Sequence, residues 1–296
     1  MNVTFLGTSC MMPTAARNTA ATLLGFKNES ILIDCGEGTQ RQLRHAGIRP
    51  TKLTRILISH WHGDHVLGLP GLIQTLGMSE YTKQLEIYGP RGTKEYLKKM
   101  LDTFVFDNKV DIKAKDISKK RFYDGKEFAL EALPLEHGIP CLGFSFVEKD
   151  RRKIKPSILK QGTIPKGPLL GKLQKGESIV YKGKRIKPED ATTVVKGRKV
   201  TYIADTLFCE NCITLADHAD LLISEAVYDS SLQEKAREYK HLTAQQSAQI
   251  AAKAEVKRLV LTHFSQRYKD VEPLVKEAKM IFPKTSAAED FTKLTI

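Results

Sequence analysis

The sequence predicts an α/β fold, and three features of its 296 residues support that prediction. Short apolar runs typical of strands alternate with amphipathic runs typical of helices, which is the pattern of layered α/β domains. The alternation occurs in two blocks, separated by a basic segment. Several apolar runs end in a histidine or an aspartate, and rigid scaffolds hold functional groups in loops at strand ends. We therefore expect one catalytic domain formed by residues 1–150 and 199–296, with an inserted arm at residues 151–198.

The first block contains the elements of about half of this domain. Apolar or alternating runs predict strands at residues 2–7, 19–26, 30–36, 53–60, 85–90, 128–138 and 141–149. Helix formers predict helices at residues 39–47, 65–78 and 93–104. Gly47 provides a stop for the first helix, whereas Pro70 and three glycines interrupt the second.

The second block repeats the alternation. Apolar runs predict strands at residues 199–206, 219–227 and 258–265, and helices are expected at residues 242–254 and 270–282. Thr243 and Gln246 form the pattern of a capping box, which marks the start of the first of these helices.

The net charge of +13 is concentrated in one segment. Residues 151–188 contain twelve lysines and arginines and a single acid, Glu177, so this segment carries a net charge of +11. Such a run is either a solvated surface or a device that grips a polyanion such as nucleic acid. We favour the second interpretation because the charge is so unevenly distributed. The segment is also poor in apolar periodicity, so we expect it to lie outside the core.

The sequence lacks the patterns of a membrane-spanning protein and of a secreted one. No apolar run approaches the roughly 20 residues that span a bilayer, and the N-terminal residues lack the pattern of a signal peptide. The five cysteines are an odd number without a dense framework, which is typical of a reducing compartment. We therefore expect a cytoplasmic protein that does not contact a membrane.

Residues 59–65, SHWHGDH, hold three of the eight histidines in the chain. His60, His62, Asp64 and His65 cannot all be buried without partners, and a divalent cation would compensate several of them at once. Adjacent Asp64 and His65 do not easily converge with the other two residues on one ion, so two ions fit better. Imidazole suits zinc, and manganese also tolerates carboxylate-rich sites. Two-metal sites stabilise the attacking and the leaving oxygens of phosphoryl transfer.

The motif SHWHGDH resembles the HxHxDH signature of the metallo-β-lactamase superfamily. His137 in LEHG, Asp205 in YIADT and His263 in LTHFS are similar, in order, to the later metal ligands of that superfamily. LGTSCMMPTAARN, KGPLLGKL, HLTAQQSAQIAAKA and LTHFSQRY together resemble one branch, the ribonuclease Z family of tRNA 3′-processing endoribonucleases. The resemblance implies a four-layer αβ/βα sandwich with an inserted basic arm.

The resemblance also implies the roles of the site residues. It implies two zinc ions per subunit, one held by His60, His62 and His137 and the other by Asp64, His65 and His263, with Asp205 bridging. It further implies that Asp64 accepts the proton of the attacking water and that His241 assists the leaving oxygen. Asp34 is similar to a family aspartate that braces the metal loop, and Glu225 is a candidate partner of His241.

The substrate implied by the resemblance is a tRNA precursor with a 3′ trailer. Cleavage after the discriminator base would leave a 3′-hydroxyl on the tRNA and a 5′-phosphate on the trailer. Candidate RNA contacts are Arg17, Asn18 and Arg267, and in the arm Lys166, Gly167, Pro168 and Lys172. The loop reads PTAARN, with alanines at 15 and 16 where many members have a lysine nearby. The family arm often serves the partner subunit, so we expect a homodimer.

Three other functions fit parts of the sequence. A hydrolase of small substrates, such as a phosphodiesterase, lactonase or thioesterase, would have no use for the basic arm. An RNA-binding protein with an inactive metal site would not need the complete ligand set. An RNA exonuclease with an inserted cap domain would need a longer chain. Cys209 and Cys212 form a CxxC pair, for which we expect a loop position without a metal or redox role.

Overall fold

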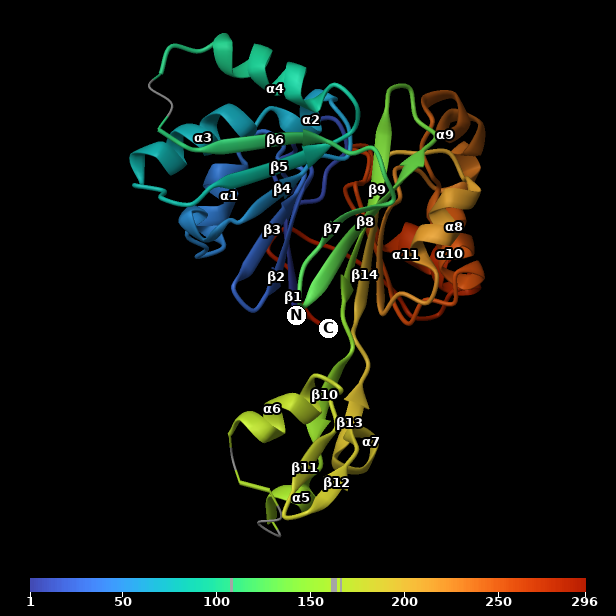
Figure 1. Cartoon of the computed structure of the whole chain (residues 1–296). Helices are drawn as coiled ribbons and strands as arrows, with labels where there is room; N and C mark the ends of the chain where they lie inside the picture. Colours follow the sequence, from blue (N-terminus) through green and yellow to red (C-terminus); the bar gives the residue numbers. More distant parts are fainter. Residues whose placement is uncertain (107–108, 161–163, 166) are drawn as a thin grey trace. The chain divides into compact units, whose positions relative to one another are not determined.

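The computed structural model describes residues 1–106, 109–160, 164–165 and 167–296 (Figure 1). The chain forms two compact units. Unit 1 comprises Met1–Tyr123, Leu130–Phe146 and Lys199–Ile296, and unit 2 comprises Asp124–Ala129 and Val147–Arg198. The insertion expected at residues 151–198 lies within unit 2.

The first of two seven-stranded sheets has the order β18-β1-β2-β3-β4-β5-β6. Its strands are β1 (Asn2–Gly7), β2 (Ala21–Phe26), β3 (Glu29–Ile33), β4 (Arg55–Leu57), β5 (Leu85–Gly89), β6 (Ile112–Asp116) and β18 (Lys293–Thr295). Neighbours from β18 to β3 pair antiparallel, and neighbours from β3 to β6 pair parallel. The carboxyl ends of β3 and β4 therefore lie at the same edge of the sheet.

The second sheet has the order β17-β16-β15-β14-β9-β8-β7. Its strands are β7 (Arg121–Asp124), β8 (Phe128–Leu135), β9 (Cys141–Glu148), β14 (Lys199–Ile203), β15 (Leu221–Glu225), β16 (Leu259–Thr262) and β17 (Thr285–Ala287). Strands β14 to β17 pair in parallel. Their carboxyl ends also lie at one edge, which is where parallel α/β sheets place functional groups.

Helices cover the outer face of each sheet in unit 1 (Figure 1). Beside the first sheet lie α1 (Thr39–His45), η1 (Pro50–Lys52), α2 (Gly63–Val66), α3 (Leu69–Met78) and α4 (Thr93–Asp102). Beside the second lie α8 (Glu210–Ala216), η2 (Ser230–Leu232), α9 (Gln233–Tyr239), α10 (Ala244–Lys253) and α11 (Glu272–Ile281). The arrangement confirms the predicted αβ/βα sandwich. The capping box predicted at Thr243 and Gln246 is present at the start of α10.

The core of unit 1 follows the alternation of buried strands. Leu32 and Ile56 pack with α1 and α3 in the apolar cluster beneath the outer helices. Their neighbours Ile33 and Leu57 point the other way, toward apolar side chains of β9. Burial on both faces explains why these strands are continuous apolar runs in the sequence.

Two predicted elements are shorter or divided in the structure. The helix expected at residues 65–78 forms as α2 and α3, because the Gly68 N–H donates to the Cys35 carbonyl oxygen at 2.9 Å instead of continuing the helix. The same approach leaves no room for a side chain, since a Cβ on Gly68 would lie 2.1 Å from the Gly36 carbonyl oxygen. Pro70 lies in the first turn of α3, where proline is tolerated. The strand expected at residues 53–60 is three residues long. After β4 the backbone leaves the ladder, and Ser59 N–H donates to Asp34 Oδ1 instead.

Unit 2 has a small core of its own, which the sequence did not predict. It contains β10 (Arg151–Ile154), α5 (Pro156–Lys160), α6 (Pro168–Gln174), β11 (Ile179–Tyr181), β12 (Lys184–Ile186), α7 (Pro188–Ala191) and β13 (Thr192–Val195). Strands β10 and β13 pair antiparallel, as do β11 and β12. Leu170 and Leu173 of α6 pack against Ile154 and Ile179. The apolar residues are too widely spaced in sequence to show this cluster as a periodicity.

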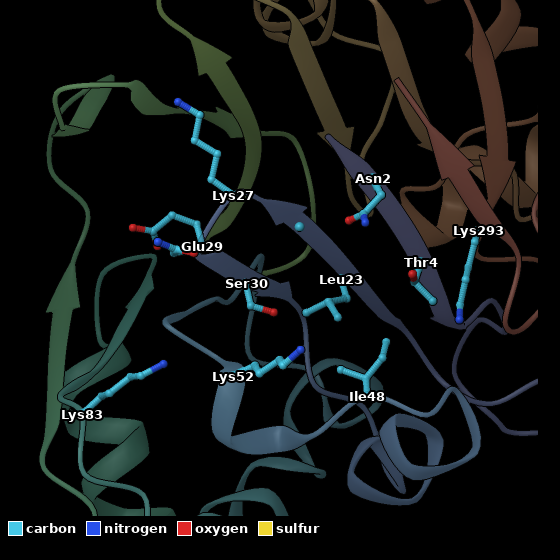
Figure 2. A pocket seen from close by; sticks show the side chains of 12 residues that line it. Asn2, Thr4, Leu23, Lys27, Glu29, Ser30, Ile48, Lys52, Lys83 and Lys293 are labelled. Carbon is cyan, nitrogen blue, oxygen red and sulfur yellow. The ribbon is translucent and has the colours of Figure 1, made fainter. Parts of the chain in front are cut away.

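The first sheet also carries a cavity of about 520 Å³ at the end opposite the carboxyl ends of its parallel strands (Figure 2). Leu23 lies in its interior, and Lys27, Lys52, Lys83 and Lys293 are among its lining residues. Because the cavity lies at the start of β3 rather than at its carboxyl end, it is separate from the histidine cluster. Among the helices of the described residues, none has the length and apolar character of a membrane span.

Candidate active site and metal centre

The predicted ligands lie together where strands of the two sheets end. His60 follows β4, and His62, Asp64 and His65 lie at and within α2. From the second sheet, His137 follows β8, Asp205 follows β14 and His263 follows β16. Contacts among these side chains join residues up to two hundred positions apart in the sequence.

One group consists of His60, His62 and His137. His60 Nε2 lies 3.0 Å from His62 Nδ1, and His62 Nδ1 lies 3.2 Å from His137 Nε2. Asp205 Oδ2 lies 3.7 Å from His60 Nε2 and 4.0 Å from His137 Nε2. The ligand atoms of these four residues lie within 4.8 Å of one another, close enough to share one ion.

A second group consists of Asp64, His65 and His263. Asp64 Oδ2 lies 3.4 Å from the Nε2 atoms of both histidines. Asp205 Oδ1 lies 3.6 Å from His65 Nε2 and 3.4 Å from His263 Nδ1. Asp205 therefore directs one carboxylate oxygen to each group.

The donor atoms of the site fit a divalent metal. His65 Nε2, Asp205 Oδ1 and both ring nitrogens of His263 are buried and have no hydrogen-bond partner among the described residues. Buried polar atoms are almost always paired, because leaving them unpaired costs free energy. Imidazole nitrogens and carboxylate oxygens are ligands of zinc and related cations. A bound cation would satisfy His65 Nε2, Asp205 Oδ1 and one ring nitrogen of His263.

Both carboxylates of the site are held in the charged form that binds metal. Burial opposes ionisation of Asp64, but His65 and His263 hold its pKa well below the usual value. Burial likewise opposes ionisation of Asp205, and its pKa is lowered by the histidines around it, His263 foremost. Both aspartates are therefore anionic at neutral pH.

Asp34 fixes the orientation of His65. It accepts hydrogen bonds from Ser59 N at 2.7 Å and from Ser59 Oγ at 2.8 Å. His65 Nδ1 lies 2.8 Å from Asp34 Oδ2, so Nδ1 donates and Nε2 is left facing Asp64 and Asp205. Such outer carboxylates set the tautomer and direction of a metal-binding histidine. Asp34 and His263 both have positive φ values, 58° and 57°, a conformation that non-glycine residues rarely adopt.

His241 lies beside the two groups and is held by Glu225. His241 Nδ1 lies 3.0 Å from Glu225 Oε2, and Glu225 Oε1 accepts from Thr206 N at 2.7 Å. Burial disfavours the imidazolium, but Glu225 and Asp205 raise the pKa of His241 to about 9. The raised pKa favours a protonated imidazole at neutral pH, and Glu225 contacts Nδ1 rather than Nε2.

Comparison with known proteins decides the family. A ribonuclease Z from Methanothermobacter thermautotrophicus is 39% identical over 298 aligned residues, which cover 100% of this chain and 97% of that protein. The chain belongs to the ribonuclease Z family. As a member, it is a metal-dependent endoribonuclease. The family model "Anti-Pycsar protein Apyc1" also matches residues 1–131, which is less than half of the chain.

Solved structures agree with the ribonuclease Z assignment. The short form of human tRNase Z superposes with a TM-score of 0.74 at 30% identity and covers 100% of this chain and 99% of that chain. The metallo-β-lactamase fold protein YhfI from Bacillus subtilis has a TM-score of 0.73 at 21% identity, with 99% and 98% coverage. The second likeness supports the fold.

The ribonuclease Z site opens into a cavity of about 670 Å³ in unit 1. Of the predicted RNA contacts in unit 1, Arg267 lines this cavity and Arg17 and Asn18 do not. Arg17 Nη2 donates to Ser265 O at 3.3 Å and to Tyr268 O at 2.6 Å. Asn18 Nδ2 donates to Glu37 O at 2.7 Å. In this structure both side chains hold neighbouring loops in place.

The remaining predicted RNA contacts belong to unit 2. Gly167 precedes α6, Pro168 is its first residue, and Lys172 is an exposed residue of its last turn. Lys166 lies outside the described residues.

Sequence reasoning missed several residues that line the cavity, among them Cys10, Met11, Met12, Leu67, Tyr228, Lys235 and Tyr239. The ligand atom of Cys10 lies within 4.8 Å of those of Asp64 and His263. Loop and helix residues of this kind carry no local pattern. For Cys10, the nearest signal was its position inside the LGTSCMMPT stretch that resembles the family.

Proposed function

We propose that this chain removes the 3′ trailer from tRNA precursors. It would cut after the discriminator base and leave a 3′-hydroxyl on the tRNA and a 5′-phosphate on the trailer. The observation that carries the proposal is Asp205, which directs one oxygen to each of two ligand groups. The names of the relatives, ribonuclease Z and human tRNase Z, supply the substrate class.

Two zinc ions per subunit fit this arrangement best, with manganese as the alternative. His60, His62 and His137 would hold the first and Asp64, His65 and His263 the second, with Asp205 between them. Bound there, the ions would act as Lewis acids on the scissile phosphate.

The side chains divide the proton transfers of the reaction. The oxygen of a water molecule attacks phosphorus, and the bond from phosphorus to the 3′-oxygen of the discriminator nucleotide breaks. Asp64 would receive the proton of the water, and its Oδ2 accepts a hydrogen bond from Met11 N at 2.8 Å. His241, kept protonated by Glu225, supplies a proton to the leaving 3′-oxygen. Positioned general acids and bases of this kind contribute about 10²–10⁴-fold each.

The basic charge of unit 2 supports a role in gripping the body of the tRNA, away from the reaction. Lys172, Lys175, Lys182, Lys184 and Arg185 are exposed, and none pairs with an acid in the described part of the chain. A cluster of free cations attracts phosphates through charge and shape, as is usual for structured RNA. We also propose that the protein is cytoplasmic and forms a homodimer in which each arm serves the partner's site. Sedimentation of the metal-loaded protein tests whether the dimer forms.

The test of the metal assignment is an Asp205→Asn variant, which keeps the size of the side chain and removes its charge. Wild-type protein should bind two zinc ions per chain and cleave a 3′-extended tRNA, whereas the variant should bind fewer and lose at least about 10³-fold in rate, the scale on which a catalytic charge acts. Asp217→Asn, at an exposed aspartate, is the control and should change neither. Normal zinc content and cleavage in Asp205→Asn would refute the proposal.

A further inference from the structure

The cavity beside the metal-binding residues has an unusual rim. Met11, Met12, Leu67 and Tyr239 line it with exposed fractions of 74%, 45%, 57% and 52%. Large apolar side chains exposed together on a protein surface mark a binding site rather than a solvated face. A phosphate group alone would gain nothing from such a rim.

Arg267 and Tyr228 form one cation–aromatic pair on this rim. The guanidinium carbon lies 5.2 Å from the centroid of the Tyr228 ring. Arg267 Nε also donates to Ser265 Oγ at 3.3 Å. The loop that carries Arg267 is held by the hydrogen bonds from Arg17 to the carbonyl oxygens of Ser265 and Tyr268. The Tyr228 ring lies 6.3 Å from the ring of His241.

Lys235 and Tyr239 form the second pair, one turn apart on α9. The ammonium nitrogen of Lys235 lies 5.8 Å from the centroid of the Tyr239 ring. The end of α9 is connected to the metal-binding residues, because His137 Nδ1 lies 3.0 Å from the carbonyl oxygen of Lys240. Tyr239 is therefore held near the reaction while its ring stays open to solvent.

The two cations of these pairs are available to a ligand. Neither Lys235 nor Arg267 forms an ion pair with an acid in the described ranges, and the acids that line the cavity are Asp64 and Asp205. Both aspartates face the proposed metal ions. The rim thus combines free positive charge with apolar and aromatic surface.

We propose that the two cation–aromatic pairs are nucleotide subsites on either side of the scissile phosphate. Each pair would take a base on its ring or guanidinium face and a phosphate on its cation, which is how proteins hold unpaired RNA. The enzyme would then require at least one unpaired nucleotide beyond the cut. This inference rests on the proposed function, and it adds a reason why RNA is preferred over small diesters.

The test compares two substrates in zinc-loaded protein: a 3′-extended tRNA and methyl p-nitrophenyl phosphate, a diester too small to reach the rim. Tyr239→Ala should raise KM for the RNA at least about fivefold, the low end for one stacked base. Tyr239→Phe keeps the ring and should stay within about twofold. Hydrolysis of the small diester should be unchanged. Met280→Ala, at a residue of α11 that is 82% exposed, controls for loss of an exposed apolar side chain.

A substrate without the base identifies what Tyr239 contacts. Two abasic substrates are compared, one without the base immediately before the cut and one without the base immediately after it. If Tyr239 contacts one of these bases, the substrate that lacks this base should be cleaved equally by wild type and by Tyr239→Ala. The tyrosine then has no partner left to lose, because the effects of removing two groups in contact do not add. Arg267→Gln should weaken RNA binding and should make that binding less dependent on salt. Lys269→Gln is the control, since Lys269 is two residues away and also exposed, and it should change neither quantity.

Two outcomes would overturn the subsites. An equal loss on RNA and on the small diester would show that Tyr239 acts on the fold, and a penalty that persists with both abasic substrates would show that it contacts no base. Failure of the proposed function has a different signature, since wild type would then hydrolyse the small diester but no tRNA precursor. The subsites can be tested in that case by fluorescence anisotropy with an unpaired oligoribonucleotide. If the subsites exist, Tyr239→Ala should bind this oligoribonucleotide more weakly than wild type does.

Discussion

The pKa of His241 is raised chiefly by the carboxylate of Glu225, which lies beside its Nδ1 atom. Glu225 is fully buried, and its two oxygens contact Thr206 N and His241 Nδ1. His241→Ala removes the proposed proton donor and leaves all seven proposed metal ligands in the chain, so we expect kcat to fall about 10²–10⁴-fold with zinc content unchanged. Single-turnover cleavage and metal analysis measure the two quantities. His218→Ala, at a histidine exposed to solvent, is the matched control, and an unchanged kcat in His241→Ala would remove its proposed role.

Cys209 provides a second prediction at this scale. Its thiol lies 3.5 Å from that of Cys212, and the hydrogen bond from Cys212 lowers the pKa of Cys209 to about 6. A lowered pKa keeps the thiolate populated above pH 6 and loses it below. Alkylation of Cys209 should therefore have its midpoint near pH 6, and Cys212→Ala should move the midpoint upward toward that of an ordinary thiol. Peptide mapping across pH measures this, and a midpoint unaffected by Cys212→Ala would contradict the account.

That the proposed ligands come together could be predicted from the sequence, whereas the residues of the rim could not, for a physical reason. His60, His137, Asp205 and His263 each follow an apolar run, so local sequence marks them as strand-end residues. The Tyr228–Arg267 contact joins two loops that are far apart in the sequence and are brought together by the pairing of β15 with β16 and by hydrogen bonds between the loops. The hydrogen bonds from Arg17 could not be predicted either, because their acceptors are carbonyl oxygens about 250 positions away in the sequence, and its contact with RNA stays a prediction.

At the scale of elements, the join between α2 and α3 depends on one close backbone approach. Gly68→Ala would place a Cβ 2.1 Å from the Gly36 carbonyl oxygen. We expect it to lower the free energy of unfolding by about 1–3 kcal/mol, as overpacking does. Gly77→Ala, in α3 itself, meets nothing closer than 3.8 Å and should instead stabilise by about 0.5–1 kcal/mol. Urea unfolding of both variants measures the difference, and equal effects would rule out this explanation of the divided helix.

Where the sequence predicts an element of unit 1, its type agrees with the structure, whereas its length often does not. The run at residues 53–60, LTRILISH, stays mostly apolar up to Ile58, so periodicity alone could not show that Ser59 turns from the ladder to Asp34. The small core of unit 2 was missed because its members, among them Ile154 and Leu173, are separated by charged and glycine-rich stretches. Contacts of long sequence separation decided both outcomes.

At the scale of the whole molecule, charge should govern how RNA binds. Replacing five exposed cations of unit 2 by glutamine (Lys172, Lys175, Lys182, Lys184 and Arg185) should weaken tRNA binding. It should also reduce the salt dependence by roughly 0.7–0.9 log units per log unit of salt for each phosphate that the variant no longer neutralises. Hydrolysis of methyl p-nitrophenyl phosphate should not change. Five exposed lysines of unit 1 replaced in the same way form the control: Lys94, Lys98, Lys269, Lys276 and Lys279. Equal weakening in both variants would assign the effect to net charge rather than to the arm.

The central claim is a metal-dependent cut at one phosphodiester of a tRNA precursor. Its most direct test is cleavage of a tRNA with a 3′ trailer, with and without a chelator, mapped to single-nucleotide resolution. The account predicts one cut directly after the discriminator base, a 5′-phosphate on the trailer, and loss of the cut in chelator with recovery on added zinc. A metal-loaded protein that leaves this RNA intact, or cuts it at scattered positions regardless of chelator, would contradict it.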